Sequence, residues 1–330
     1  MEKRKWCVCG YDEKKVENIV AQNGVAPYTA LLLSARGITA PAEVRSFCFD
    51  EEGLCDPFLL PDMEKAVDCI NEALDAGEKI AVYGDYDADG LTATVILYTY
   101  LLSQGADVIY YVPDRNTEGY GMNKAAVNKI YDEGVKLIVT VDNGISAFEE
   151  AELINRLGMK LVVTDHHTVS DRLPEAIAVV NPHRQDSRCA FRDWAGVGVA
   201  FKLICALEGE DGEYMLDEYA QLVSIGTIAD VVPLVGENRY IVRRGIELMN
   251  SEPVACIEAM KEAADYSGKE LNATSVAFTI VPRINAMGRI STVKPVLELL
   301  MENGNLPNYA RMLHECNAER QRIEQEILCD

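Results

Sequence analysis

Residues 80–91 place three carboxylates directly after an apolar run, in the order Ile-Ala-Val-Tyr-Gly-Asp-Tyr-Asp-Ala-Asp-Gly-Leu. The apolar run predicts a buried strand. Asp85, Asp87 and Asp89 alternate after it, so an extended backbone would point all three the same way. Converging carboxylates repel one another and raise one another's pKa unless a cation neutralises them. The segment predicts a metal site; the alternative is an acidic surface turn, since Asp and Gly favour turns.

Polar residues also follow two later apolar runs of the strand type: Asp142, and then Asp165, His166 and His167. The chain has 4 histidines, and two of them are adjacent here. Carboxylate and imidazole together suit manganese, iron or zinc. The alternatives are an aspartate-capped turn with incidental histidines, and a phospho-accepting Asp142 of the kind found in receiver-like domains.

A further carboxylate, Asp230, lies in the otherwise apolar segment 224–234. A buried carboxylate without a partner costs several kcal/mol, so we expect a cation or a hydrogen-bond donor beside it. The alternative is an exposed aspartate at a helix end before Pro233.

A possible phosphate-binding segment comes later in the chain. Arg283, Asn285 and Arg289 surround Gly288, and we expect a glycine turn that cradles an anion. Planar guanidinium groups match phosphate oxygens two at a time. Ordinary surface ion pairs are the alternative.

The elements that must position these residues alternate between strands and helices. Predicted strands are Lys79–Tyr83, Asp107–Val112, Leu137–Val141, Lys160–Thr164 and Ala176–Val180. Predicted helices between them are Leu91–Gln104, Lys124–Glu133 and Ser146–Leu157. This alternation is typical of an α/β fold, here with a parallel five-stranded sheet and helices on both faces. Ligands bind at the carboxyl ends of such strands, where the polar residues lie.

The remaining sequence reads as helical. Residues 1–62 predict an N-terminal helical extension that packs on the catalytic domain, which we assign to residues 63–305. Helices are predicted from Gly196, and over Tyr214–Ala229, Asn238–Met249, Val254–Ala263 and Thr274–Ile280. A long amphipathic helix over 306–330, with Leu313, Ile323 and Ile327 on one stripe, ends the chain.

Composition limits the classes of function. The 330 residues are 48% hydrophobic and 25% charged, as in a globular protein. No apolar run reaches the length of about 18 residues that a membrane span needs, and no signal-peptide core follows the N-terminus. We therefore expect a cytoplasmic protein with no membrane partner. The net charge of −22 argues against a simple basic nucleic-acid binder, although not against an enzyme that meets phosphates through cations and a few arginines.

The 10 cysteines are scattered without zinc-ribbon spacing. Cys7 and Cys9 form the only close pair. We interpret the cysteines as reduced, mostly buried thiols of a reducing compartment.

The polar segments, in this order, resemble the four motifs of the DHH phosphoesterase superfamily: Gly84–Gly90, Val141–Gly144, Asp165–His167 and Gly226–Asp230. The segment Pro282–Arg289, with Tyr111–Arg115 and Glu118–Gly121, narrows the resemblance to the RecJ branch. The resemblance runs from about residue 20 to the C-terminus. It implies a single-strand-specific 5′-to-3′ exonuclease of DNA repair and recombination that releases nucleotides by two-metal hydrolysis.

The resemblance also implies roles for individual residues. Two divalent ions would share Asp142: one held by Asp89, Asp142, His166 and Asp230, the other by Asp87, Asp142 and water. His167 would face the scissile phosphate, with Asp85 and Asp165 as further catalytic candidates, and the substrate phosphates would meet Arg115, Arg283, Asn285 and Arg289. The mixed ligands favour Mn²⁺ over Mg²⁺.

One departure from the pattern concerns the second ion. Many relatives have a histidine four residues before the first ligand, where this chain has Tyr83. We therefore expect that ion to be held weakly, or only when substrate phosphate supplies oxygens.

RecJ-like enzymes continue with a DHH-associated domain and an oligonucleotide-binding fold, and no segment here resembles either. We expect the chain to cover the N-terminal catalytic part, with 306–330 as the start of a connector helix, and to bind metal but degrade DNA poorly. Single-stranded DNA is the expected partner, with a single-strand-binding protein and a helicase as further candidates. Alternatives are a nano-RNA or cyclic-dinucleotide phosphodiesterase, a pyrophosphatase, and a non-catalytic replication scaffold. The scaffold is disfavoured because such relatives usually lose metal ligands.

Overall fold

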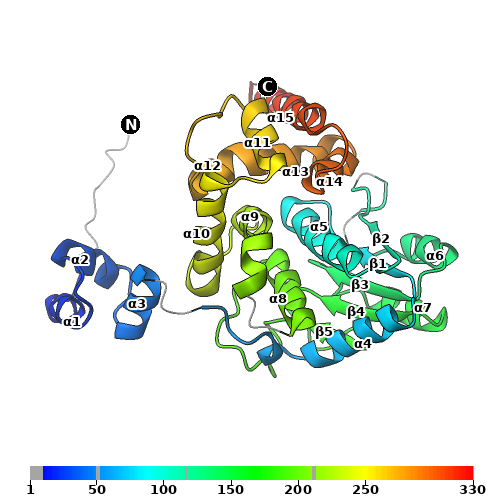
Figure 1. The fold of residues 1–330 in the computed structure, drawn as a ribbon, viewed down its shortest axis with the longest axis horizontal. Coiled ribbons are helices and arrows are strands. Elements are labelled where there is room, and N and C mark those ends of the chain that lie inside the picture. The colour runs from blue at the N-terminus through cyan, green and yellow to red at the C-terminus, as the bar shows by residue number, and fades with distance from the viewer. Residues whose placement is uncertain (1–9, 50–52, 116, 120, 210–212, 330) are drawn as a thin grey trace.

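The centre of the fold is one sheet of five parallel strands in the order β2-β1-β3-β4-β5 (Figure 1). The structure is a computed structural model that describes residues 10–49, 53–115, 117–119, 121–209 and 213–329. The strands are β1 (Ile80–Tyr83), β2 (Val108–Tyr111), β3 (Leu137–Val141), β4 (Lys160–Thr164) and β5 (Ala178–Val180). All residues of β1, β3 and β5 are buried, as expected for a parallel sheet that is covered on both faces.

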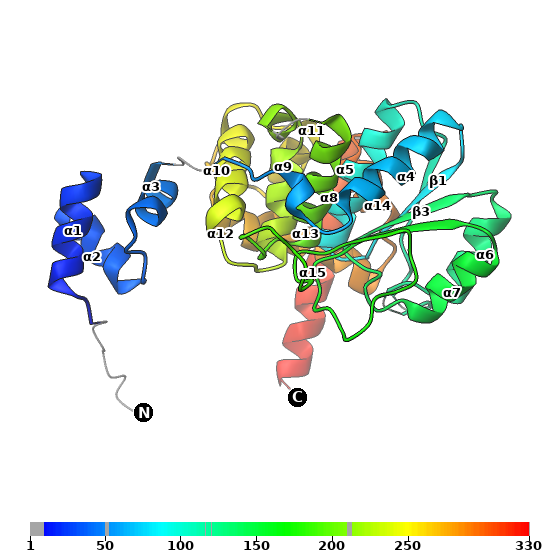
Figure 2. The ribbon, with the colours of Figure 1, turned by 90° about the horizontal axis from the view of Figure 1, so that it is seen from below.

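Alternate strand residues enter separate hydrophobic cores on the two faces of the sheet. Val82 and Val139 pack in one core, whereas Ala81 and Ile138 pack in the other. Helices α4 (Met63–Asp75), α5 (Ala88–Ser103) and α8 (Gly196–Glu208) cover the first face; α6 (Lys124–Asp132) and α7 (Phe148–Arg156) cover the second (Figure 2). The predicted α/β architecture is therefore confirmed.

The strand order reverses beside β1. The chain leaves β1 for β2 on one side and returns through α6 to β3 on the other. Tyr83 at the end of β1 is paired in register with Thr140 near the end of β3. The carboxyl ends of β1 and β3 therefore form the switch point at which open parallel sheets bind ligands.

A second helical layer follows the sheet and has its own core, which includes Leu91, Ile225, Met260 and Ile284. Its elements are α9 (Glu213–Ala229), α10 (Gly236–Ser251), α11 (Ala255–Ala263), α12 (Ala273–Ser275), the π-helix η2 (Val276–Ile280), α13 (Val281–Ile290), α14 (Lys294–Leu300) and α15 (Leu306–Cys329). The predicted stripe of α15 is buried only in its first half: Leu313 is buried, whereas Ile327 is 71% exposed.

The predicted glycine turn at residues 281–289 is wrong, because this segment is helix α13. The preceding turn is widened: the Val281 N–H donates to Val276 O, five residues back. Pro282 has no N–H for the next bond of a regular α-helix, and a wider turn at this point accommodates it.

The N-terminal helices form a small unit of their own (Figure 1). They are α1 (Glu13–Asn23), α2 (Pro27–Ala35) and α3 (Pro41–Phe49), and they enclose the residues Ile19, Ala30, Leu33 and Val44. Arg239 of α10 lies 4.0 Å from the Phe47 ring and donates to the Phe47 carbonyl oxygen. The chain then enters the sheet domain through the short helix η1 (Pro57–Leu59).

Within the described ranges, no helix is long and apolar enough to cross a membrane. Cys69, Cys189, Cys205 and Cys256 are buried and form no disulfide. The predicted close pair of Cys7 and Cys9 lies outside the described residues.

Candidate metal centre

The turn after β1 separates the three carboxylates that alternate in sequence. Asp85 is buried, and its Oδ1 accepts a hydrogen bond from the Tyr86 N–H. Asp87 caps α5, because its Oδ1 accepts from the Gly90 N–H at 3.0 Å. Helix α5 therefore begins at Ala88, not at Leu91, and the expectation that an extended backbone points all three carboxylates the same way is wrong.

Instead, these carboxylates lie beside side chains from other segments of the chain. Ligand atoms within 4.8 Å of one another come from three sets of residues: Asp85, Asp87 and Asp142; Asp89, His166 and Asp230; and Asp142, His166 and His167. The structure thus brings together all five residues predicted as metal ligands and places Asp85 beside them. Asp142 and His166 are shared between sets, which suits two neighbouring ions.

His166 lies at the centre of these sets. Its Nε2 is 3.1 Å from Asp142 Oδ1 and 3.8 Å from Asp89 Oδ2, and its Nδ1 is 3.7 Å from Asp230 Oδ2. Both His166 Nε2 and Asp142 Oδ1 are buried, and neither has a hydrogen-bond partner in the described part of the chain. Such atoms are costly to bury unless something coordinates them. A divalent cation between them fits both donors.

Asp142 occupies a strained position. It follows β3 with φ of 59°, a left-handed conformation that Asp tolerates better than most residues. A Cβ on Gly196 would lie 2.4 Å from the Asp142 Cβ, so only glycine allows α8 to approach so closely. The sequence predicts only that a helix begins at Gly196. The closeness of Gly196 to Asp142 depends on packing between distant segments.

The N-terminus of α8 holds the carboxylate of Asp89. The Gly196 N–H donates to Asp89 Oδ2 at 2.6 Å, and the Val197 N–H donates to Oδ1 at 2.8 Å. The first turn of a helix carries unpaired N–H groups and partial positive charge, which favour an anion. This arrangement fixes the direction of Asp89 before any cation arrives.

The electrostatics of the cluster favour a bound cation. Burial, and then the neighbouring carboxylates, raise the pKa of both Asp89 and Asp142 well above 3.8. Burial likewise raises the pKa of Asp85 to about 7 and that of Asp230 to about 6. Without a cation, these carboxyls keep their protons at pH values where an ordinary carboxyl has lost them. The site therefore favours the binding of positive charge.

The two histidines have opposite electrostatic environments. Burial and the adjacent His167 lower the pKa of His166 to about 4, so it is neutral near pH 7, as a metal ligand must be. His167 Nδ1 is 2.7 Å from Asp165 Oδ1, and this hydrogen bond raises the pKa of His167. Asp165 also accepts from the N–H groups of Ile145 and His166, so it holds the turn and orients His167.

Comparisons with known proteins agree with this geometry. The family model for the DHH family, N-terminal domain, matches residues 79–227. A Bacillus subtilis (strain 168) protein named single-stranded-DNA-specific exonuclease RecJ is 39% identical over 325 residues, which cover 97% of this chain and 41% of the relative. A crystal structure of exonuclease RecJ bound to manganese is 37% identical, with a TM-score of 0.73 over 82% of this chain and 69% of that one. The chain belongs to the RecJ branch of the DHH family.

A second RecJ structure, from Thermus thermophilus in complex with Mn²⁺, matches with a TM-score of 0.81 and 33% identity. It covers 96% of this chain and 46% of that one. This RecJ-family chain spans about half the length of the curated relatives it matches, between 40% and 56%.

The four residues predicted to bind phosphate have different environments in this RecJ-family chain. Arg283 is buried and donates to Thr279 O and to His314 Nδ1, so its guanidinium joins α13 to α15. Asn285 Oδ1 accepts from the Ala88 N–H at 2.8 Å and so supports the first turn of α5. The Arg283 side chain therefore faces the protein interior, whereas Asn285 is only partly buried.

Arg115 and Arg289 are exposed and lie near Tyr86. The Arg115 guanidinium is 5.3 Å from the centre of the Tyr86 ring, and both arginines lower the pKa of Tyr86 against the larger effect of burial. Gly288 permits the close approach of α13, since a Cβ there would lie 2.5 Å from Tyr86 O. These two arginines remain candidates for contact with substrate phosphate.

Tyr83, where many relatives have histidine, is fully buried on the α6 and α7 face of the sheet. Its hydroxyl donates to Gly121 O, and its ring stacks on Tyr111 at 5.3 Å. It is absent from the carboxylate and histidine sets described above.

A cavity of about 220 Å³ opens beside His167. Residues 143–147 line it, together with Gly121, Met122, Glu150 and Asp165. It lies at the start of α7 and can receive part of a molecule whose phosphate lies at His167.

Sequence reasoning missed several residues that support the site. Asn143 Nδ2 donates to Val141 O and Tyr83 O and so joins the ends of β3 and β1. The Trp194 backbone makes a hydrogen bond to His166. Val231 follows Asp230 with φ of 63° and is 85% exposed. A β-branched residue in this conformation is a strained outlier of the kind found at functional sites, but no sequence signal reveals it.

Proposed function

We propose that this chain is the catalytic part of a 5′-to-3′ exonuclease that hydrolyses the phosphodiester bonds of single-stranded DNA with two divalent cations. The observation that carries the proposal is the position of Asp142, which lies in one set with Asp85 and Asp87 and in another with His166 and His167. In addition, Asp142 Oδ1 and His166 Nε2 both lack hydrogen-bond partners among the described residues. The family, and the names and bound ions of the relatives, support it.

We assign the ligands of the two proposed ions as follows. Asp89, Asp142, His166 and Asp230 would hold one ion, and Asp87 with Asp142 would hold the other, beside Asp85. A set that mixes imidazole with carboxylate favours Mn²⁺, with Mg²⁺ as a weaker alternative. Bound cations supply the positive charge that offsets the converging carboxylates and the charge developing on the scissile phosphate.

The chain's own residues orient the reacting groups. Asp165 holds the Nδ1 of His167 and so orients the imidazole ring that we propose faces the scissile phosphate. The α8 N–H groups fix Asp89, and the Asn143 amide fixes the turn that carries Asp142. This prior positioning lowers the cost of organising the site when substrate binds.

We assign the contacts with substrate phosphate at the edge of the metal centre to Arg115 and Arg289. The chain is strongly acidic overall, with a net charge of −22. The two exposed guanidinium groups beside the metal centre supply local positive charge that can attract a polyanion. We also propose a single-strand-binding protein and a helicase as partners, because such proteins present the single strands that this activity consumes. The proposal includes a cytoplasmic location.

The proposal is tested with single strands labelled at the 5′ or the 3′ end and incubated with Mn²⁺. We expect release of mononucleotides from the 5′ end, abolished by EDTA and by Asp142→Ala. Asp217→Ala, which removes an exposed ion pair with Arg244 far from the site, is the matched control and should keep full activity. Faster cleavage of dinucleotides than of long strands would favour the nano-RNA phosphodiesterase instead. Absence of bound Mn²⁺ at millimolar concentration would overturn any metal-dependent activity.

A further inference from the structure

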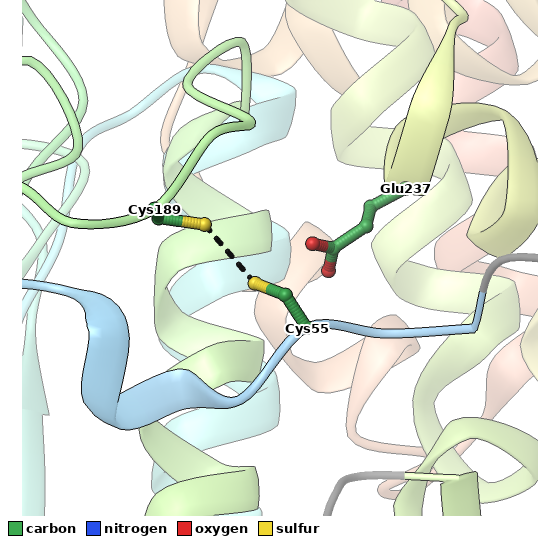
Figure 3. A group of neighbouring side chains, drawn as sticks. All are labelled: Cys55, Cys189 and Glu237. Atoms are coloured by element: carbon green, nitrogen blue, oxygen red, sulfur yellow. Dashed lines mark hydrogen bonds between the residues drawn. The ribbon is translucent and has the colours of Figure 1, made fainter. Parts of the chain in front are cut away.

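A second cluster of reactive side chains lies away from the metal centre (Figure 3). Cys55 belongs to the segment between α3 and η1, Cys189 to the loop between β5 and α8, and Glu237 to the first turn of α10. The two sulfur atoms are 3.1 Å apart, and one thiol donates a hydrogen bond to the other. Three segments that are distant in sequence therefore meet at a thiol pair.

A buried lysine supplies positive charge to this pair. The side chain of Lys202, from α8, is fully buried, and its Nζ donates to Glu237 Oε2 at 3.0 Å and to the Cys55 carbonyl oxygen. The hydrogen bond from Cys55 lowers the pKa of the Cys189 thiol to about 7, and the Lys202 ammonium acts in the same direction. The same hydrogen bond raises the pKa of Cys55, as expected for the donor. One thiolate is thus stabilised beside one thiol.

The surroundings favour thiol chemistry over metal binding. The two sulfurs and a Glu237 oxygen could in principle contact one cation. However, the Lys202 ammonium already occupies that carboxylate, and a dication there would lie beside a buried positive charge. Three ligands also fall short of the four that a structural zinc site uses.

We propose that Cys55 and Cys189 are an oxidisable pair, which hydrogen peroxide converts to a disulfide between the segment preceding η1 and the loop preceding α8. The Cys189 thiolate attacks one peroxide oxygen, the O–O bond breaks, and hydroxide leaves a sulfenic acid on Cys189. The Cys55 sulfur then displaces the sulfenic hydroxyl and the S–S bond forms. Two thiols lose two electrons and two protons, and the peroxide becomes two water molecules.

The geometry suits this reaction. Cys189 is 3% exposed, so an oxidant as small as peroxide is needed to reach it, and the resolving sulfur is already in contact. The loop that carries Cys189 continues to Trp194, whose backbone contacts His166, and to Gly196, which holds Asp89. The disulfide would therefore fasten the chain entering from the N-terminal helices to the segment that supports the metal ligands.

The test treats the reduced, folded chain with hydrogen peroxide, blocks remaining thiols with N-ethylmaleimide and maps peptides without reduction. We expect the intact mass, measured before blocking, to fall by two hydrogens, and we expect a Cys55–Cys189 linked peptide that dithiothreitol removes. Cys55→Ser and Cys189→Ser should each abolish the link. Cys48→Ser is the matched control, because Cys48 is a partly buried free thiol seven positions from Cys55, and this variant should still form the link.

A measurement on the unaltered chain guards against variants that fail to fold. The rate at which hydrogen peroxide forms the Cys55–Cys189 link should rise with pH through a midpoint near 7, compared with about 8.5 for an ordinary thiol. Oxidation that stops at single cysteines without a link would overturn the proposal. So would one equivalent of tightly bound Zn²⁺ that protects both thiols and is lost in Glu237→Gln.

Discussion

Asp142 sets a trade-off between metal binding and the stability of the metal-free protein, and Asp142→Asn tests it. Burial and the Asp89 carboxyl raise the pKa of Asp142 well above 3.8, so the metal-free folded chain keeps a proton that the unfolded chain loses. Each pH unit between 3.8 and the raised pKa costs the folded state about 1.4 kcal/mol. Asn has the same shape, tolerates the left-handed backbone and has no proton to hold. We therefore expect the metal-free variant to be more stable than the metal-free wild type at pH 7.

The sign of the pH dependence follows from proton counts. Between pH 3.8 and the raised pKa, the folded chain binds more protons than the unfolded chain, so the stability of the metal-free protein falls as pH rises. The slope for Asp142→Asn should be shallower by about 1.4 kcal/mol per pH unit. Mn²⁺ opposes this difference: at a hundred times Kd it adds about 2.7 kcal/mol to the stability of the wild type, whereas the variant has lost a shared ligand and gains less.

Urea unfolding followed by circular dichroism, at pH values from about 5 to 7.5 and with either EDTA or Mn²⁺, measures both effects. Asp217→Asn, at an exposed ion pair with Arg244, should show neither. A metal-free Asp142→Asn that is less stable than the wild type at pH 7, with an unchanged pH slope, would refute this account of the cluster.

Three further predictions concern the supports of the site. Gly196→Ala should weaken Mn²⁺ binding at least about tenfold by calorimetry, because its Cβ meets Asp142 at 2.4 Å; Gly198→Ala, which meets only the Trp194 side chain at 3.0 Å, should have a smaller effect. Val231→Gly should raise the free energy of unfolding by about 0.5–1 kcal/mol by removing strain, and a loss of stability would contradict that reading. Arg289→Ala should weaken single-strand binding with stability within about 0.5 kcal/mol, whereas Arg283→Ala should cost about 2–3 kcal/mol in urea; equal effects would contradict their assignment.

The sheet, and the meeting of the candidate metal ligands at its edge, could be predicted from sequence because both depend on local patterns. Leu137–Val141 and Lys160–Thr164 are continuous apolar runs, and their predicted bounds match β3 and β4. Parallel strands end at one edge of the sheet, so residues that follow such runs must converge there. Asp142 and His166 needed no further information.

Other features could not be predicted because they depend on contacts between distant segments. The sequence shows a guanidinium at position 283, but only the packing of α13 on α15 turns it toward His314. Gly288 resembles a turn residue, whereas in the helix its missing side chain admits Tyr86 O. Alternation of Asp85, Asp87 and Asp89 predicted a common direction, and local capping by Asp87 overrode it.

The spacing of the ligands along the chain has a consequence for biosynthesis. The donors run from Asp85 to Asp230, and Asp89, one of the earliest, is fixed by N–H groups at residues 196 and 197. A nascent chain that has not yet reached Asp230 lacks a donor, and one whose α8 has not docked leaves Asp89 unoriented. Metal capture is thereby coupled to completion of the fold. The candidate metal site is therefore complete only after the sheet and the second helical layer have assembled.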